Sequence, residues 1–303
     1  MAVGVIVCTL NRAGELRDCL GAIRQQTLTP HVVAIVDASG PATFDANAET
    51  IAHCAKASSS IEFVHLSAPE GLTHQRNLGV SVVMRAEVAW VQFVDDDVIL
   101  SADYIERIGR QFEDRAVIGA EGRDDNLRTQ PRRVFRLLYP RLNRLSGLSK
   151  TGHNWFPVQR SAVVDWLSGC APAYRRDALA ELAFDERRTG NGTGEDVDFS
   201  FRARRLGELR HDSDAVYQHR PSPINRARGA DLARDVITHR ARLATDFPRS
   251  FTPGWVRYGL LVEGVWCVAV ASCRRNRQRR TYGIVLLRSA VARRVSPHEH
   301  AVQ

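Results

Sequence analysis

Three consecutive carboxylates, Asp95, Asp96 and Asp97, follow the apolar run 88–94. The run is short, rich in branched and aromatic residues and free of charge, which predicts a buried β-strand. Unpaired buried carboxylates are very costly, so the strand must deliver these side chains to solvent, to a cation or to a protein partner. In open α/β sheets the carboxyl ends of the strands face the ligand crevice. The triplet therefore indicates a ligand or cation site, and a solvated acidic turn is the alternative.

Four further polar segments follow or begin predicted elements. They are 8–12 after a first strand at 3–9, 36–39 after a second strand at 32–36, 71–79 leading into a helix at 75–85, and 194–198 opening a helix at 196–206. The segments that follow strands are expected at the same edge of the sheet as the acidic triplet.

The elements that must position these segments alternate along the chain. Strands are expected at 3–9, 32–36, 61–66 and 88–94, and helices at 15–26, 45–56, 75–85 and 103–112. Such alternation predicts a mostly parallel sheet with helices on both faces. The stretch 121–160 has no clear period and is expected to be a functional loop or an insertion. His153 and Trp155 in it are candidates for ligand contacts, with core filling as the alternative for Trp155. Helices at 176–182 and 196–206 and a short strand at 216–220 follow.

In their order and spacing, the five segments resemble family 2 glycosyltransferases of the GT-A fold, over about residues 3–220. The resemblance implies a catalytic domain over residues 1–225 that extends a cell-surface glycan or glycolipid. The donor would be a nucleoside-diphosphate sugar and the acceptor a glycan or lipid-linked hydroxyl. The resemblance also implies Mg²⁺ or Mn²⁺, a hard cation that neutralises the diphosphate as the glycosidic bond breaks.

The resemblance makes Asp97 the main metal ligand and places Asp95 or Asp96 near the ribose. An extended chain would put Asp95 and Asp97 on one side and Asp96 on the other. His219, in the strand pattern at 216–220, corresponds to a histidine that several family members use as a third metal ligand. The alternative for His219 is an ordinary surface or core histidine.

Besides the triplet, four residues are expected to bind or flank the nucleotide. Asp37 corresponds to a contact with the base, and a carboxylate accepts the imide N–H of uracil or thymine, so a UDP- or dTDP-linked sugar is favoured. Capping of the following turn through Ser39 is the alternative. Arg76 corresponds to an arginine beside the nucleotide, with a surface helix charge as its alternative. Thr9 and Arg12 flank the first loop and are expected to line the base pocket, although Arg12 could simply start a helix.

Asp196 corresponds to the general base of inverting transfer, and Glu195 stands beside it. Such transfer requires a carboxylate opposite the nucleotide that takes the proton of the acceptor hydroxyl. An unperturbed aspartate has a pKa of about 4 and is ionised at neutral pH. Both residues begin a helix, where the dipole favours carboxylates, so helix capping is the alternative. The segment 169–171 corresponds, less specifically, to the family's segment beneath the donor sugar.

Composition and motifs argue against several other functional classes. The net charge is +8, but no aromatic-interleaved basic motif or finger spacing supports nucleic-acid binding. The six cysteines form no CxxC pair, and no leader pattern precedes the first strand, which favours a cytoplasmic protein. A sugar-phosphate nucleotidylyltransferase would require a Gly-rich, Lys-containing loop after the first strand. Residues 9–12 do not form such a loop. A non-catalytic sugar-nucleotide-binding scaffold protein is disfavoured by the intact acidic motifs.

The remaining residues, 226–303, are predicted to form a basic helical arm. An apolar stretch at 255–272 is followed by an arginine cluster at 274–280. The uninterrupted apolar part is expected to be too short for a bilayer span, which needs about 20 residues. An amphipathic hairpin with this cluster would suit attachment to anionic lipids at the inner face of the cell membrane. A helical pair packed on the catalytic domain and a dimer contact remain open alternatives.

Overall fold

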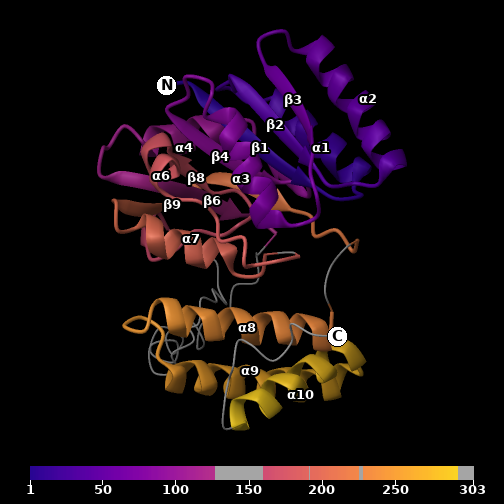
Figure 1. Ribbon diagram of the computed structural model, residues 1–303, viewed down its shortest axis with the longest axis vertical. Coiled ribbons are helices and arrows are strands. Elements are labelled where there is room, and N and C mark those ends of the chain that lie inside the picture. The colour runs from indigo at the N-terminus through magenta and orange to yellow at the C-terminus, as the bar shows by residue number, and fades with distance from the viewer. Residues whose placement is uncertain (127–159, 191, 225–227, 293–303) are drawn as a thin grey trace. The chain divides into compact units, whose positions relative to one another are not determined.

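The computed structural model describes residues 1–126, 160–190, 192–224 and 228–292 (Figure 1). The chain divides into two units. Among the described residues, those before 225 belong to the first unit and those from 228 onward to the second. His153 and Trp155 lie outside the described residues.

The first unit alternates strands and helices along most of its length. In chain order its elements are β1 (Val3–Thr9), α1 (Ala13–Arg24), β2 (Val32–Asp37), α2 (Pro41–Ala57), β3 (Glu62–Ser67), α3 (Leu72–Val83), β4 (Trp90–Asp95), β5 (Val98–Leu100), α4 (Tyr104–Gln111), β6 (Val117–Asp124), β7 (Ala162–Val164), β8 (Ala173–Arg175), α6 (Arg176–Glu181), α7 (Glu195–Ala203) and β9 (Glu208–His219).

These strands form one mixed, nine-stranded sheet in the order β3-β2-β1-β4-β8-β6-β9-β5, with β7 paired to β9. The first four strands of this order are parallel, and β6 is parallel to β9. The short strand β8 is antiparallel to both β4 and β6. Thr9 pairs with Asp37, and Cys8 with Asp95, so three strands end at one edge.

Alternation along the strands produces two cores, one on each face of the sheet. Val3, Val5 and Val7 of β1 pack with buried residues of α1, α2 and α4. Ile6 of the same strand points to the other face, where α3, α6 and α7 supply the buried residues. The strands are therefore apolar on both faces, as expected for a sheet with helices on both sides.

Two of the expected elements differ from those observed. β4 ends at Asp95, and Asp96 and Asp97 form a turn into β5, so the expected alternation of the three carboxylates does not apply. The strand β9 is 12 residues long, whereas the sequence pattern indicated only 216–220. Its polar first half is held in place because it pairs with β6 and with β7.

The described part of the second unit consists of α8 (Ala230–Asp246), α9 (Pro253–Arg274) and α10 (Arg277–Val291). Inside it, Arg240 donates to Glu263 at 2.5 Å, and the Tyr282 hydroxyl donates to the same carboxylate at 2.6 Å. The helices α9 and α10 approach closely at two glycines. A Cβ on Gly264 would lie 2.9 Å from the carbonyl oxygen of Gly283. The segment thus forms the helical hairpin expected from its sequence.

By length and composition alone, α9 is the one helix in the described part of the chain that could cross a membrane, over 253–272. This differs from the expectation that the apolar part is too short. The same criterion is met by core helices of soluble proteins. Glu263, near the middle of this helix, is 3% exposed and ion-paired, so one face of α9 is packed within the unit.

Candidate active site

The middle carboxylate of the triplet, Asp96, points into the protein. It is 2% exposed, and both of its oxygens accept hydrogen bonds. The Thr9 hydroxyl donates to one oxygen at 2.7 Å and Arg12 donates to the other at 2.9 Å. Burial raises the pKa of Asp96, while Arg12 lowers it. Asp96 therefore holds the first loop in place.

Asp97 is paired with His219. Its Oδ1 lies 3.2 Å from His219 Nε2, and its Oδ2 accepts the N–H of Ser222 at 3.0 Å. Burial would raise the pKa of Asp97, but these two groups and the nearby Arg12 outweigh burial and hold it well below its usual range. Asp97 is therefore negatively charged at neutral pH and can act as a ligand for a cation.

The side chain of Asp95 is 31% exposed, which makes it the most accessible of the three carboxylates. Its Oδ1 accepts a hydrogen bond from Arg76 at 3.2 Å. Burial raises the pKa of Asp95 to about 6, although the Arg76 guanidinium lowers it in part. Asp95 is thus the member of the triplet that a ligand can reach most easily.

Arg76 links the end of β4 to the start of α7. Its side chain is only 3% exposed, and its guanidinium lies 5.7 Å from the ring centre of Phe93 and 5.4 Å from that of Phe184. It donates to Asp95, and at 2.6 Å to Glu195. Arg76 is therefore not the surface charge that was the alternative interpretation, but a buried bridge between two acidic motifs.

The segment 168–172 lies between these motifs. The carbonyl of Gly169 accepts from Arg76 at 2.8 Å, and its N–H donates to Asp196 at 3.1 Å. The carbonyl of Cys170 accepts the N–H of Asp95 at 2.9 Å. A Cβ on Gly169 would lie 2.9 Å from Glu195 Oε1, so this close approach needs a glycine.

Asp196 and Glu195 occupy the first turn of α7. Asp196 is half-buried and accepts the N–H groups of Gly169 and Val197, the latter at 2.8 Å. Burial raises the pKa of Asp196, and these N–H groups and Arg76 lower it in part. Glu195 is 5% exposed, and burial raises its pKa against the opposing effect of Arg76. Asp196 is thus the more exposed of the two carboxylates, and Glu195 is the buried one.

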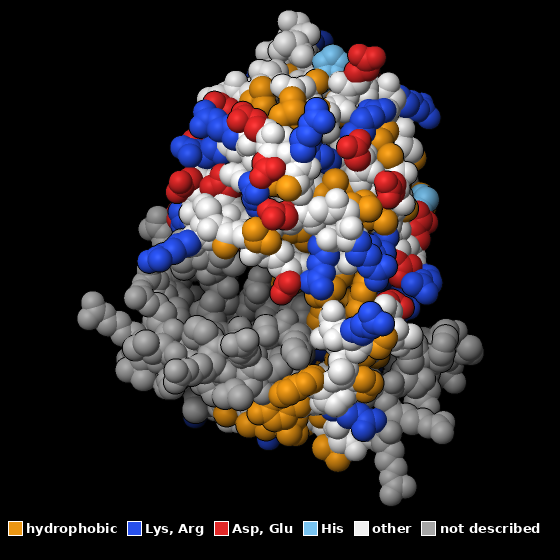
Figure 2. All heavy atoms as spheres, turned by 90° about the vertical axis from the view of Figure 1, so that its left-hand side faces the viewer, with side chains coloured by type: hydrophobic (Ala, Val, Ile, Leu, Met, Phe, Trp, Pro, Cys, Tyr) orange, Lys and Arg blue, Asp and Glu red, His pale blue; other side chains and the backbone are white. Residues whose placement is uncertain are grey.

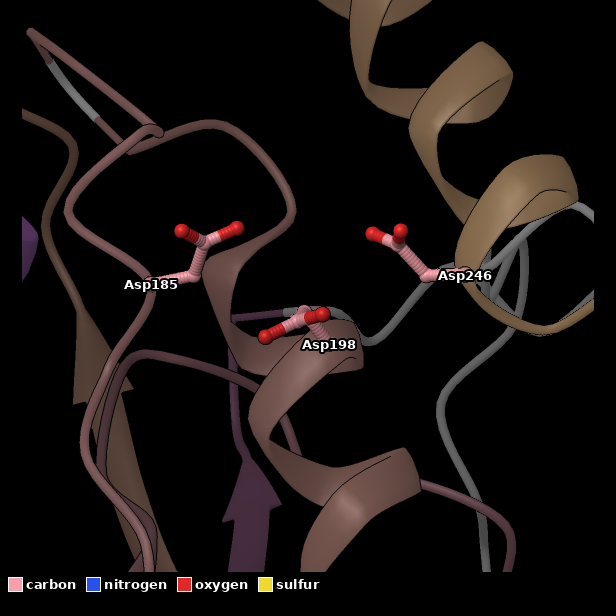
Figure 3. A group of neighbouring side chains, drawn as sticks. All are labelled: Asp185, Asp198 and Asp246. Carbon is pink, nitrogen blue, oxygen red and sulfur yellow. The ribbon is translucent and has the colours of Figure 1, made fainter.

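Asp198, two residues further on, has a different environment. Figure 3 shows it on α7 with Asp185 in the preceding loop; Asp246, also drawn there, belongs to the second unit. Arg202 donates to Asp198 at 2.7 Å, and Arg188 lies 3.4 Å from it. Asp198 is therefore neutralised by arginines of the first unit.

Asp37 is fully buried at the end of β2. One oxygen accepts the N–H of Ser39 at 2.8 Å, and the other accepts from Asn47 at 2.8 Å and lies 3.1 Å from His65 Nε2. Burial would raise the pKa of Asp37, but His65, Ser39 and Asn47 outweigh it and lower the pKa. This arrangement matches the turn-capping alternative rather than a carboxylate open to a base.

The segment that follows β9 returns to the first loop. Arg12 donates to the carbonyl of Ile224 at 2.7 Å, and the Ser222 hydroxyl donates to Glu15 at 2.7 Å. Together with the bond from Ser222 to Asp97, these contacts bring His219 and the first loop to the same place.

The site gathers five carboxylates around two guanidinium groups. The carboxylates belong to Asp95, Asp96, Asp97, Glu195 and Asp196, and the guanidinium groups to Arg12 and Arg76. Such an acidic cluster attracts cations. Asp97 Oδ1 and His219 Nε2 are 3.2 Å apart. Neighbouring ligands of one cation, with bonds of about 2.1 Å, have a similar spacing, so this donor pair fits Mg²⁺ or Mn²⁺.

Three structural contributors were not identified from the sequence. Glu121 of β6 accepts the N–H of Ser168, and the Tyr104 hydroxyl donates to Ala171 at 2.8 Å, so both fix the segment 168–172. Ser222 provides the N–H for Asp97. Of the three, only Glu121 could have been recognised from the sequence, because a carboxylate inside an apolar strand pattern needs a specific partner.

Comparison with known proteins agrees with this geometry. The model of the family described as glycosyl transferase family 2 matches residues 4–181, more than half of the chain. The chain belongs to this family. The comparison with curated proteins gave no match.

Solved structures confirm the predicted GT-A fold for this family 2 glycosyltransferase. The mannosyltransferase PcManGT from Pyrobaculum calidifontis, in complex with GDP-Man and Mn²⁺, matches with a TM-score of 0.60 and 18% identity, over 95% of this chain and 85% of that one. S. aureus TarS matches with a TM-score of 0.52 and 18% identity, over 96% of this chain but 52% of TarS. TarS 1–349 with UDP-GlcNAc matches with a TM-score of 0.53 and 16% identity, over 95% and 91%.

Proposed function

We propose that this protein is a metal-dependent inverting glycosyltransferase that moves a sugar from a nucleoside-diphosphate sugar to a hydroxyl of a glycan or glycolipid. One observation carries the proposal: Arg76 and Gly169 join the accessible carboxylate Asp95 to the candidate base Asp196. Donor-side and acceptor-side carboxylates thus belong to one network. Structural neighbours with bound GDP-Man or UDP-GlcNAc support the donor class.

In the proposed reaction Asp196 acts as general base. It removes the proton of the acceptor hydroxyl as that oxygen bonds to the anomeric carbon. The bond from this carbon to the diphosphate oxygen breaks, and its electron pair leaves with the nucleoside diphosphate. Direct attack from the opposite face inverts the anomeric configuration. Glu195 is the anchor that keeps Asp196 in place through its pair with Arg76.

Asp97 and His219 would hold Mg²⁺ or Mn²⁺, and Asp95 is the most accessible carboxylate of the triplet. When bound, the metal supplies positive charge that stabilises the leaving diphosphate. Arg12 and Thr9 keep the triplet in position through Asp96, so all three act by positioning rather than by touching the nucleotide.

Because Asp37 is buried, it no longer indicates which nucleobase the donor carries. The preference for uracil or thymine depended on a free carboxylate, and both oxygens of Asp37 are occupied. We propose that Asp37 instead shapes the turn at Ser39, so the donor test must cover UDP, dTDP and GDP sugars.

We also propose that the catalytic domain spans residues 1–225 with 226–303 as an appended arm, and that the enzyme works in the cytoplasm. The cysteines whose side chains are described are free of disulfides, which suits a reducing compartment.

A donor screen tests the proposed function. The true donor with Mn²⁺ should raise the thermal midpoint, because a ligand at a hundredfold excess over its Kd stabilises the folded state by about 2.7 kcal/mol. Proton NMR of the transfer product should then show the opposite anomeric configuration to the donor. Binding without turnover would favour a scaffold protein. Release of pyrophosphate from a nucleoside triphosphate and a sugar phosphate would favour a nucleotidylyltransferase.

Arg76→Met should destabilise the protein by about 3–5 kcal/mol, because it leaves Glu195 buried without its positive partner. Arg76→Lys should lose less stability but still lose activity, since one ammonium cannot replace three directed bonds. Urea unfolding followed by circular dichroism provides the measurement. The control is Arg202→Met on α7, where Asp198 keeps Arg188 and the loss should be nearer 1 kcal/mol. Equal losses for the two methionine variants would contradict the bridging role.

A further inference from the structure

An apolar stripe runs along the outer face of α9. Tyr258, Leu261, Val265 and Trp266 are 44%, 39%, 55% and 50% exposed. At about 100° per residue these positions fall within an arc of about 140° on one side of the helix. Monomeric proteins rarely expose large contiguous apolar patches, and such patches mark interaction surfaces.

The opposite side of α9 is already occupied within its own unit. Val256, Leu260, Cys267 and Ala271 are buried there, and Glu263 is ion-paired with Arg240 of α8. Among the described residues, the stripe is therefore the exposed face of a helix whose other face packs within its own unit. In Figure 2, hydrophobic side chains gather in the part of the view that contains the helical unit, whereas charges of both signs cover the first unit.

The turn from α9 to α10 adds positive charge at the end of the stripe. Residues 274–280 include five arginines and no acidic residue. The side chains of Arg275, Arg277 and Arg280 are exposed. A second copy of the chain would bring a second cluster of the same sign, whereas anionic lipid headgroups complement this charge.

We propose that the stripe and the arginine turn form a docking surface for an anionic lipid bilayer. The helix α9 lies in the headgroup region, with Leu261, Val265 and Trp266 inserted toward the acyl chains and the arginines among the phosphates. Apolar burial together with attraction to anionic lipids is the known physical basis of such attachment. The surface attaches without spanning, because spanning would remove Glu263 from Arg240 inside the unit. The proposal is independent of the reaction.

The test is co-sedimentation of the full-length protein with vesicles of phosphatidylcholine mixed with phosphatidylglycerol, or of phosphatidylcholine alone, across a salt series. Binding should require the anionic lipid and weaken as salt rises. Each arginine near an anionic surface contributes about fivefold to partitioning. Combining Arg275→Gln, Arg277→Gln and Arg280→Gln should thus weaken it about 100-fold. Combining Leu261→Gln, Val265→Gln and Trp266→Gln should weaken it at least about tenfold.

Matched controls are exposed residues of the first unit. Arg17→Gln, Arg85→Gln and Arg115→Gln together change the net charge equally, and Val163→Gln with Leu206→Gln removes exposed apolar side chains. Both controls should keep vesicle binding, and all variants should keep their thermal midpoints and transfer to a soluble acceptor analogue.

Three results would overturn the proposal. The full-length protein could ignore anionic vesicles at low salt. The stripe variant could change the oligomeric state in light scattering while leaving vesicle binding intact, which would make the stripe a contact with a second copy. Bound protein could resist extraction with alkaline carbonate, which would mean that α9 spans the bilayer.

Discussion

Asp97→Asn is expected to lower the rate of transfer by at least about 100-fold, because the variant loses several kcal/mol of metal-derived stabilisation of the leaving diphosphate. Asparagine keeps the size of the side chain but loses the negative charge that, with His219 3.2 Å away, fits a divalent cation. The enhancement of donor affinity by Mn²⁺ should disappear as well. Calorimetric titration of the donor with and without Mn²⁺, together with steady-state kinetics, measures both effects.

Because Asp97 is buried, this experiment needs a control for the loss of stability. The sequence suggested an exposed strand end, but the Asp97 side chain is 2% exposed and holds the N–H of Ser222. The variant should therefore also lose about 1.5–3 kcal/mol of stability. Asp198→Asn, which removes a buried carboxylate paired with Arg202, should lose comparable stability and keep Mn²⁺-dependent binding. Near wild-type turnover of Asp97→Asn would contradict the metal assignment.

Asp196→Asn should lower kcat by about 100-fold or more while leaving the donor Kd nearly unchanged. The amide can still accept one of the two N–H bonds, from Gly169 or Val197, but it cannot take a proton. Single-turnover kinetics and donor titration separate the two quantities. An equal loss of donor affinity would mean that Asp196 serves the nucleotide or the structure instead.

The pH profile provides the control for this assignment. A general base works only when ionised, so kcat should fall as pH drops through the pKa of Asp196. Burial raises that pKa, so the fall should occur at higher pH than for an ordinary aspartate, whose pKa is about 4. The residual activity of Asp196→Asn should lack this acidic limb. A limb that persists in the variant would belong to another group.

Local patterns in the sequence were sufficient for the order of elements in the first unit. Short apolar runs between polar turns predicted the strands near 3–9, 32–36, 61–66 and 88–94, because a strand buried on both faces needs uncharged side chains throughout. The antiparallel strand β8 was not identified, because a three-residue strand has no period to detect. Its pairing between β4 and β6 depends on segments far away in the chain.

The five motif segments were equally visible in the sequence, and with them the family and the GT-A fold. The sequence determined which side chains stand at the ends of the strands, because strand ends are local features. Only the tertiary structure decided which of them face solvent. Thr9 and Asp96, 87 positions apart, meet in a buried bond, and Arg76 meets Glu195 across 119 positions. Whether a polar side chain can touch a substrate depends on such distant partners, because they decide how far its atoms are buried and already engaged in hydrogen bonds.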